Sequence, residues 1–332
     1  MDIKKSLVAS TLATLMLTSG PVLAGPKSLT FEGNSETDFS YSSDDDSVKV
    51  NKRSAEIKAT LVITEALKAV IKVDLAEAIN EGEFDEDDLE SMIEEAYIEV
   101  DANGYATILV GKHQMAFAQQ YAAMAIHEND RRDAITRQDE MIGITVKLPN
   151  DTLKIVGKVV DSLEISAFET GKGDLDVASD AGVSFRATKA LSDKVELAVS
   201  GLMKEQDGAD EQALAVSATY KADNGWTWFA EGIWMNNSSE YGDADYLVTA
   251  GASKEVGPGT LVLQADYLEN YGAEIGASYH LPVTQNITFS PEIRHNFDTD
   301  ETTVGARVTM KASVTKTLNG GEGGKLPDSG AL

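Results

Sequence analysis

The strongest constraint on the fold is an alternation of apolar and polar residues with a period of two, from about residue 139 onward. In residues 286–294, Ile287, Phe289 and Ile293 are separated by polar or charged side chains. Successive side chains of a β-strand point to opposite faces, so each such segment predicts a strand with one apolar and one polar face.

A soluble β-sandwich also alternates in this way, but two further features favour a membrane barrel. The segments run to about ten residues, which is long enough to cross a bilayer when tilted, whereas sandwich strands are closer to five or six residues. Aromatic residues also lie toward the ends of these segments, as in the two interfacial girdles of membrane barrels. They are Tyr220, Trp226, Trp234, Tyr246, Tyr267, Tyr279 and Phe297.

The connections between segments alternate between short and generally longer, as in outer-membrane barrels with short periplasmic turns and longer outer loops. The short connections carry turn-forming residues and fall at 101–104, 149–151, 191–193, 223–225, 257–259 and near Pro282. The other connections are mostly more acidic and fall at 42–51, 78–93, 113–138, 170–179, 205–210, 236–243 and 298–301, with 269–270 as a short exception.

Sixteen strands fit this rhythm, with a range of fourteen to eighteen because residues 152–169 could conceal a hairpin. The expected strands are 29–41, 53–63, 67–77, 94–101, 105–112, 139–148, 152–169, 180–188, 194–203, 211–221, 225–235, 245–254, 260–268, 271–280, 285–295 and 302–312. We therefore predict an all-β transmembrane antiparallel β-barrel. A barrel of this strand number leaves an aqueous channel, whereas eight strands are filled by their own side chains.

The N-terminus has the layout of a secretory signal peptide: Lys4 and Lys5, an apolar stretch at 7–17, and small residues before a predicted cut after Ala24. We expect three parts, namely the signal peptide at 1–24, the barrel at 25–313 and a flexible Gly-rich tail at 314–332.

Composition restricts the kinds of site that the chain can carry. It has 55 Asp+Glu against 28 Lys+Arg, a formal net charge of −27, which argues against nucleic acid as a partner. With no Cys and 4 His, the chain offers little for a metal centre, and we predict neither a metal nor a cofactor. Catalytic motifs are absent, so we do not expect an enzyme, and we expect His113 and His127 to be solvated loop residues.

The acidic run at 81–90 holds seven carboxylates but lacks the glycine of an EF-hand calcium loop. We interpret it as a solvated outer loop, with loose divalent bridging to lipopolysaccharide left open.

One stretch resembles a known family. Ala96-Tyr97-Ile98-Glu99, then Asn103-Gly104, then 107–112 (TILVGK) are similar to the strand–turn–strand before the third loop of Gram-negative porins. The resemblance implies an outer-membrane channel, usually a homotrimer in contact with lipid and lipopolysaccharide. It also implies that the third outer loop, here 113–138, folds into the lumen and narrows the pore.

The charged residues of that loop and of the polar strand faces are then the candidate pore residues. In the constriction loop these are Glu128, Asp130, Arg131, Arg132, Asp133 and Arg137. On the lumen wall they are Lys147, Arg186, Glu231, Glu274, Glu292, Arg294, Arg307 and Lys311. Opposed carboxylates and guanidinium groups across a narrow section would set ion preference, although Arg131 and Arg132 could instead pair with Glu128 and Asp133 within the loop.

Three functions follow from these patterns. The first is a passive diffusion channel for ions and small polar solutes, weakly cation-preferring because of its acidic surplus. The second is a structural or adhesive outer-membrane barrel without an open pore, which the continuous polar face of the last nine strands disfavours. The third is a soluble ligand-binding β-protein, which would stay in solution without detergent.

Overall fold

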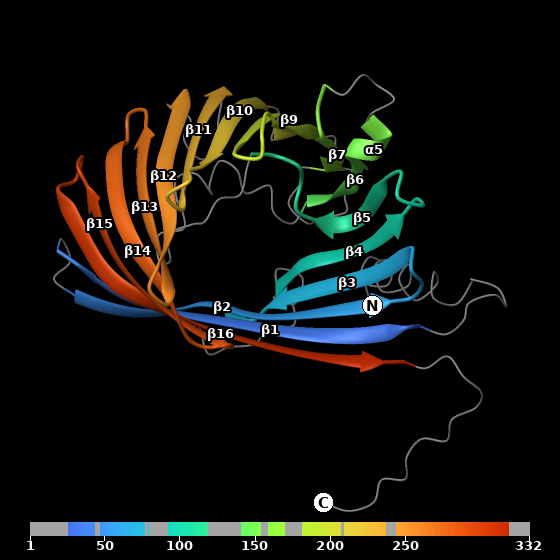
Figure 1. The fold of residues 1–332 in the computed structure, drawn as a ribbon, viewed down its shortest axis with the longest axis horizontal. Coiled ribbons are helices and arrows are strands. Elements are labelled where there is room, and N and C mark those ends of the chain that lie inside the picture. The colour runs from blue at the N-terminus through green and yellow to red at the C-terminus, as the bar shows by residue number, and fades with distance from the viewer. Residues whose placement is uncertain are drawn as a thin grey trace, which may run out of the picture.

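In the computed structural model the chain forms a single closed antiparallel barrel of sixteen strands (Figure 1). The structure describes residues 26–43, 47–76, 79, 92–118, 141–153, 159–169, 181–206, 209–236 and 244–318. The strands are β1 Ser28–Ser42, β2 Ser47–Val62, β3 Leu67–Asp74, β4 Ile93–Asp101, β5 Thr107–His113, β6 Met141–Pro149, β7 Ser162–Glu169, β8 Ala181–Ala190, β9 Val195–Gln206, β10 Ala209–Lys221, β11 Trp226–Asn236, β12 Tyr246–Val256, β13 Gly259–Leu268, β14 Gly272–Thr284, β15 Ile287–Asn296 and β16 Glu301–Thr317. The predicted fold class and strand number are confirmed.

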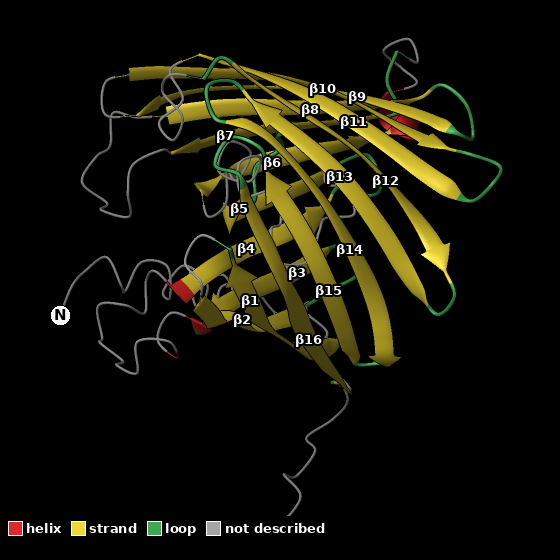
Figure 2. Cartoon of the chain, turned by 90° about the vertical axis from the view of Figure 1, so that its left-hand side faces the viewer, coloured by secondary structure: helices red, strands yellow, loops and turns green. Residues whose placement is uncertain are grey.

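Each strand pairs with its neighbours along the chain, and the ring closes where β1 pairs with β16. This closing register runs from Ser28 opposite Thr317 to Ser42 opposite Thr303. Figure 1 shows the blue and red ends of the chain side by side at this seam, and Figure 2 shows the oblique course of the strands. Closure gives every strand a neighbour on both sides, which is what a sheet without covering layers requires.

The prediction of a long seventh strand is wrong in its first half. The connection after β6 contains a short helix, α5 Asn150–Leu153, and β7 begins only at Ser162. The turn expected at 149–151 is therefore the start of a longer connection. Leu153 is buried, so the apolar residues that extended the strand pattern backwards include one that packs in the connection instead. Among the described residues, no helix has the length and apolar content of a membrane span.

The wall of the barrel is uneven in height. β1, β2 and β16 have 15, 16 and 17 residues, whereas β3 to β7 have between 7 and 9. At about 3.3 Å a residue, the longest strands extend roughly 50 Å and the shortest roughly 25 Å.

The two faces of the sheet differ sharply in chemistry. On β15 and β16 the large apolar side chains are open, with Ile293 51% and Val304 47% exposed. Their neighbours on the other face are charged and buried, with Glu292 4% and Arg307 2% exposed. On these two strands the period-two alternation of the sequence is therefore realised as one apolar and one polar face.

The hairpin that carries the family resemblance has the turn that its sequence predicts. Asn103 and Gly104 both have a positive φ, 56° and 75°, which asparagine and glycine tolerate best. The Gly104 N–H donates to Asp101 Oδ1 at 2.6 Å. This turn joins β4 to β5, and the third outer connection starts at the other end of β5.

Candidate functional site

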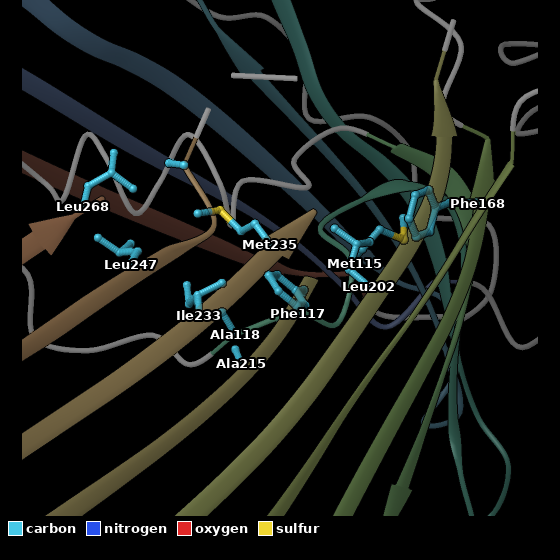
Figure 3. Packing of buried hydrophobic residues seen from close by; sticks show 11 residues of the cluster. Met115, Phe117, Ala118, Phe168, Leu202, Ala215, Ile233, Met235, Leu247 and Leu268 are labelled. Atoms are coloured by element: carbon cyan, nitrogen blue, oxygen red, sulfur yellow. The ribbon is translucent and has the colours of Figure 1, made fainter. Parts of the chain in front are cut away.

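The start of the third connection identifies the inner face of the barrel. Residues 114–118 leave β5 and run along the inside of the wall, where Met115, Phe117 and Ala118 pack in one cluster with Leu202 of β9 and Ile233 of β11 (Figure 3). Residues two apart on a strand share a face, so the wall residues of this cluster fix which face of each strand is internal. The remainder of the connection, including the predicted constriction residues Glu128, Asp130, Arg131, Arg132, Asp133 and Arg137, lies outside the described residues.

All eight predicted lumen-wall residues lie in strands, and their alternation places them on this internal face. Glu231 lies two residues before Ile233 on β11, and Glu274 of β14 is opposite Asp266, two residues before the inward Leu268. Lys311 shares the face of Arg307 and is exposed near Asn34. Glu231, Glu274, Glu292 and Arg307 are between 2% and 7% exposed, which is far more buried than open lumen residues would be.

The seam between β1 and β16 is closed on the inside by an arginine. Arg307 donates from Nε and Nη2 to the two oxygens of Asp38, at 2.6 and 2.9 Å, and its Nη1 lies 3.1 Å from Glu36 Oε2. The Arg307 and Asp38 side chains are 3% and 9% exposed. A bidentate arginine–carboxylate pair is directional as well as strong, so this contact fixes the register in which the barrel closes.

A second charged cluster lies on the inner side of β2, β3 and β4. Lys72 Nζ lies 3.0 Å from Glu56 Oε1 and 2.6 Å from Glu94 Oε2. Oxygens of Glu56, Asp74 and Glu94 all come within 4.8 Å of one another, close enough to hold an ion. The Lys72 ammonium group already supplies positive charge to two of these carboxylates, and Asp74 Oδ1 accepts from the Ala55 and Ala76 amides. We therefore describe it as an ion-pair cluster rather than a metal centre.

A third cluster runs across β6, β7 and β8. Glu164 lies between two bases, with Lys147 Nζ at 3.5 Å and Arg186 Nη2 at 3.1 Å. The Arg186 Nη1 also donates to the Ala118 carbonyl of the third connection at 3.2 Å. This arginine therefore joins the charged wall to the loop.

Two further inward pairs each join neighbouring strands of the wall. Arg294 Nη1 donates to Glu274 at 2.9 Å, and the Asn296 amide donates to the other oxygen of the same carboxylate. Lys204 of β9 and Glu211 of β10 lie 2.7 Å apart and are 8% and 10% exposed. The sequence reasoning missed this last pair because Lys204 and Glu211 fell beside an expected outer loop at 205–210.

His113 contradicts its prediction as a solvated loop residue. It ends β5, is 2% exposed, and its Nδ1 lies 2.8 Å from the Gly111 carbonyl, which can only accept a hydrogen bond. In the neutral ring Nε2 then accepts from Thr145 Oγ1 at 2.7 Å. His127 lies outside the described residues.

The hydrogen bonds continue from this histidine to the third connection. Thr145 Oγ1 lies 2.7 Å from Ser166 Oγ, and Ser166 Oγ accepts from the Ala116 N–H at 3.1 Å. With Thr145 donating to the ring, Ser166 donates to Thr145. The result is an ordered chain of bonds from the loop backbone through β7 and β6 to His113.

The expectation of a continuously polar inner face is also wrong in one sector. On β10 to β13 the inner face carries Ala215, Ile233, Leu247 and Leu268, none more than 1% exposed. They are consecutive partners across the sheet, so they form one apolar strip around the wall. Figure 3 shows Phe117 and Ala118 of the third connection close to this strip. We call these four residues the apolar strip.

The barrel is similar to solved porin structures. A triple mutant of the Rhodopseudomonas blastica porin superposes with a TM-score of 0.60 at 16% identity, over 86% of this chain and 100% of that chain. A second variant of the same porin gives a TM-score of 0.58 at 15% identity over the same shares. The chain has the porin fold. No protein-family model matches the sequence, and no curated protein matches it.

The porin fold explains the main features of the barrel. Its barrel accounts for the even number of strands and for the pairing of each strand with its neighbours along the chain. Sequence identity of 15% to 16% supports the fold alone, so the role of each inner-wall residue follows from its own contacts.

Proposed function

We propose that this protein is an outer-membrane channel through which ions and small polar solutes diffuse passively, and that it is not an enzyme. The observation that carries the proposal is the division of the sheet into an exposed apolar outer face and an inner face that is charged outside the apolar strip. An apolar band such as Ile293 and Val304 suits contact with lipid, whereas the inward and exposed Lys147 and Lys311 suit a water-filled interior. A barrel of sixteen strands is wide enough to enclose an aqueous path.

The predicted weak cation preference is supported by the charges of the inner wall. Arg307 and Lys72 each contact two carboxylates, so these two clusters carry a surplus of negative charge. Glu231 and Glu292 add carboxylates on β11 and β15, and of the three clusters described above the one around Glu164 carries a surplus of bases. Rings of charged side chains set ion preference in narrow channels, and the acidic excess favours cations.

We infer that the pore residues on the wall are Lys147, Arg186, Glu231, Glu274, Glu292, Arg294, Arg307 and Lys311. The constriction loop residues Glu128, Asp130, Arg131, Arg132, Asp133 and Arg137 remain part of the proposal. Its support is that residues 114–118 already run along the inside of the wall when they leave β5.

The proposed location is the outer membrane of a Gram-negative bacterium, after removal of the signal peptide near Ala24. Lipid and lipopolysaccharide are the proposed surroundings. A homotrimer is proposed from the family resemblance, and the small outward residues Ala230, Ala250 and Ala265, all exposed, would allow two subunits to approach closely.

Electrical recording tests this function. The mature chain, purified in detergent, is added to a planar bilayer with a salt gradient. We expect stepwise conductance and a reversal potential of the sign that cation preference gives. A barrel that migrates as folded before heating but never conducts would refute the channel and favour the structural or adhesive alternative. An anion-signed potential would refute the cation preference alone.

A solved neighbour described as "Asymmetric conductivity of engineered proteins" has a TM-score of 0.57 with this chain at 15% identity. Its description concerns conduction through that engineered protein. It supports the choice of conductance as the first measurement on this chain.

A further inference from the structure

We propose that Ser200 and Arg186 form a clamp that fixes the direction in which the third connection leaves the wall, so that both are positioning residues for the pore. The inference rests on the proposed function, because that function makes this connection the narrow part of the channel. The clamp itself is built entirely from described residues of β8, β9 and the start of the connection.

Both polar groups of one peptide residue are held. The Ala118 N–H donates to Ser200 Oγ at 2.9 Å, and the Ala118 carbonyl accepts from Arg186 Nη1 at 3.2 Å. Ala118 is 2% exposed and Ser200 is 2% exposed, so water does not compete freely for these bonds. Buried backbone groups are costly to leave unpaired, which gives the two contacts their effect.

The backbone at Ala118 is in a conformation that needs such support. Its φ is 53°, in the left-handed region that residues with a Cβ adopt rarely. Strained backbone of this kind persists only where the surroundings hold it, and it is concentrated at functional sites. Here the two partners of the clamp lie on opposite polar groups of the strained residue.

A further hydrogen bond at residue 116 defines the direction in which the connection runs. Two residues earlier, the Ala116 N–H donates to Ser166 Oγ of β7. Residues 116 and 118 are therefore attached to β7 and β9, which are two strands apart and separated by roughly 10 Å. The connection crosses the strands instead of following one of them, and Met115 and Phe117 pack in the apolar cluster on the way.

Arg186 is itself held in place. Its Nη2 donates to Glu164 Oε1 at 3.1 Å, which leaves Nη1 for the Ala118 carbonyl. A planar guanidinium group can serve two acceptors at fixed angles, whereas a lysine ammonium on a flexible stem is a single point of charge. Arg186→Lys should keep the ion pair with Glu164 and lose the contact with the loop.

The chain offers a matched control for the serine. Ser184 of β8 faces inward, is 3% exposed, and its hydroxyl has no hydrogen-bond partner among the described residues. Ser184→Ala and Ser200→Ala therefore remove the same group from neighbouring strands at equal burial. They differ in whether that group holds the loop.

Two readouts are needed, one of them independent of conduction. Hydrogen exchange of the peptide that contains Ala118, measured on the whole folded barrel in detergent, should be about two- to tenfold faster in Ser200→Ala and in Arg186→Lys, as the loss of one net hydrogen bond predicts. Ser184→Ala should match the wild type. In planar bilayers the first two variants should show an added or widened conductance level, and Ser184→Ala should not.

Equal exchange and equal conductance in Ser200→Ala, Arg186→Lys and the wild type would overturn the clamp. A change in Ser184→Ala as large as that in Ser200→Ala would overturn it too, because loosening would then be unspecific. Faster exchange in both clamp variants of a protein whose wild type never conducts would support the clamp and refute the channel.

Discussion

Two sectors of the inner wall are stabilised by different interactions, one by ion pairs and the other by apolar packing. Around the seam, from β16 through β1 to β4, the wall is held by the buried ion pair of Arg307 with Asp38 and by the half-buried ion pairs of Lys72. On β10 to β13 the same inward face carries the apolar strip. The charged sector can face water, whereas the apolar strip is stable only when it is covered, and the start of the third connection packs beside it. The inner face of such a barrel therefore needs to be polar only where it is left open.

The largest expected loss of stability on mutation lies in the charged sector. Arg307→Ala would remove the base shared by the buried Asp38 and the half-buried Glu36, which should cost about 3 to 5 kcal/mol of unfolding free energy. Denaturant unfolding in detergent micelles, followed by heat-modifiable migration, measures this loss. Lys27→Ala is the control, because its ion pair with Glu65 is exposed and should contribute nothing measurable. Equal unfolding midpoints for the two variants would contradict the assignment.

The apolar strip should respond to lost volume. Leu247→Ala should destabilise the barrel by about 2 to 3 kcal/mol, because it opens a cavity at a residue that is 1% exposed. Val248→Ala, one residue along and 46% exposed on the outer face, serves as the comparison and should cost less. Denaturant unfolding in the same micelles measures both losses of unfolding free energy. A larger loss for Val248→Ala than for Leu247→Ala would mean that the apolar strip is not covered.

Two substitutions in the Lys72 cluster of the charged sector should shift ion selectivity in opposite directions. Glu56→Gln removes negative charge beside Lys72 and should move the reversal potential toward weaker cation preference, whereas Lys72→Gln should move it the other way. Planar-bilayer recording in a salt gradient compares both variants with the wild type. Shifts of the same sign would show that the potential does not follow the charge of this wall.

A smaller effect concerns pH at the connection before β7. Hydrogen bonds from the Lys189 ammonium and the Ala190 amide hold the pKa of Asp161 below its ordinary value. A carboxyl group with a lowered pKa in the folded state stabilises that state above its unfolded pKa of about 4, and this contribution is lost as pH falls through the folded value.

The rate of hydrogen exchange in the peptide that contains Asp161 should therefore rise below about pH 4 in the wild type, after correction for the intrinsic rate. In Asp161→Asn the exchange should already be faster at pH 7 and should show no further step. A step of the same size in both proteins would assign the pH dependence to another group.

The sequence predicted one half of the two-sector comparison and not the other. Period-two alternation locates a strand and its two faces, and it placed Arg307 and Glu292 on the polar face because the adjacent Val308 and Ile293 are apolar. It could not locate the apolar strip. In β11 both Trp234 and Ile233 are apolar, and alternation does not say what covers an inward apolar residue.

Two local errors have similar causes. β7 was predicted too long because the apolar residues of the preceding connection continue the strand pattern, although Leu153 packs in α5. His113 was predicted to be solvated because its partners Gly111 and Thr145 become neighbours only through the chain turn and the pairing of β5 with β6. Contacts across strands depend on register, which a single sequence does not specify residue by residue.

The central claim is that one face of the sheet meets water and the other meets lipid, and cysteine labelling in proteoliposomes tests it most directly. The chain has no cysteine of its own, so single substitutions give a clean signal. Lys147 on the inner face is 44% exposed, and Ile165 on the outer face of the adjoining strand is 47% exposed. The two residues lie at neighbouring levels of the β6–β7 register. A charged, membrane-impermeant thiol reagent should label Lys147→Cys and spare Ile165→Cys, while both react after denaturation. Equal labelling of the two in the membrane, or labelling of Ile165→Cys alone, would contradict the account.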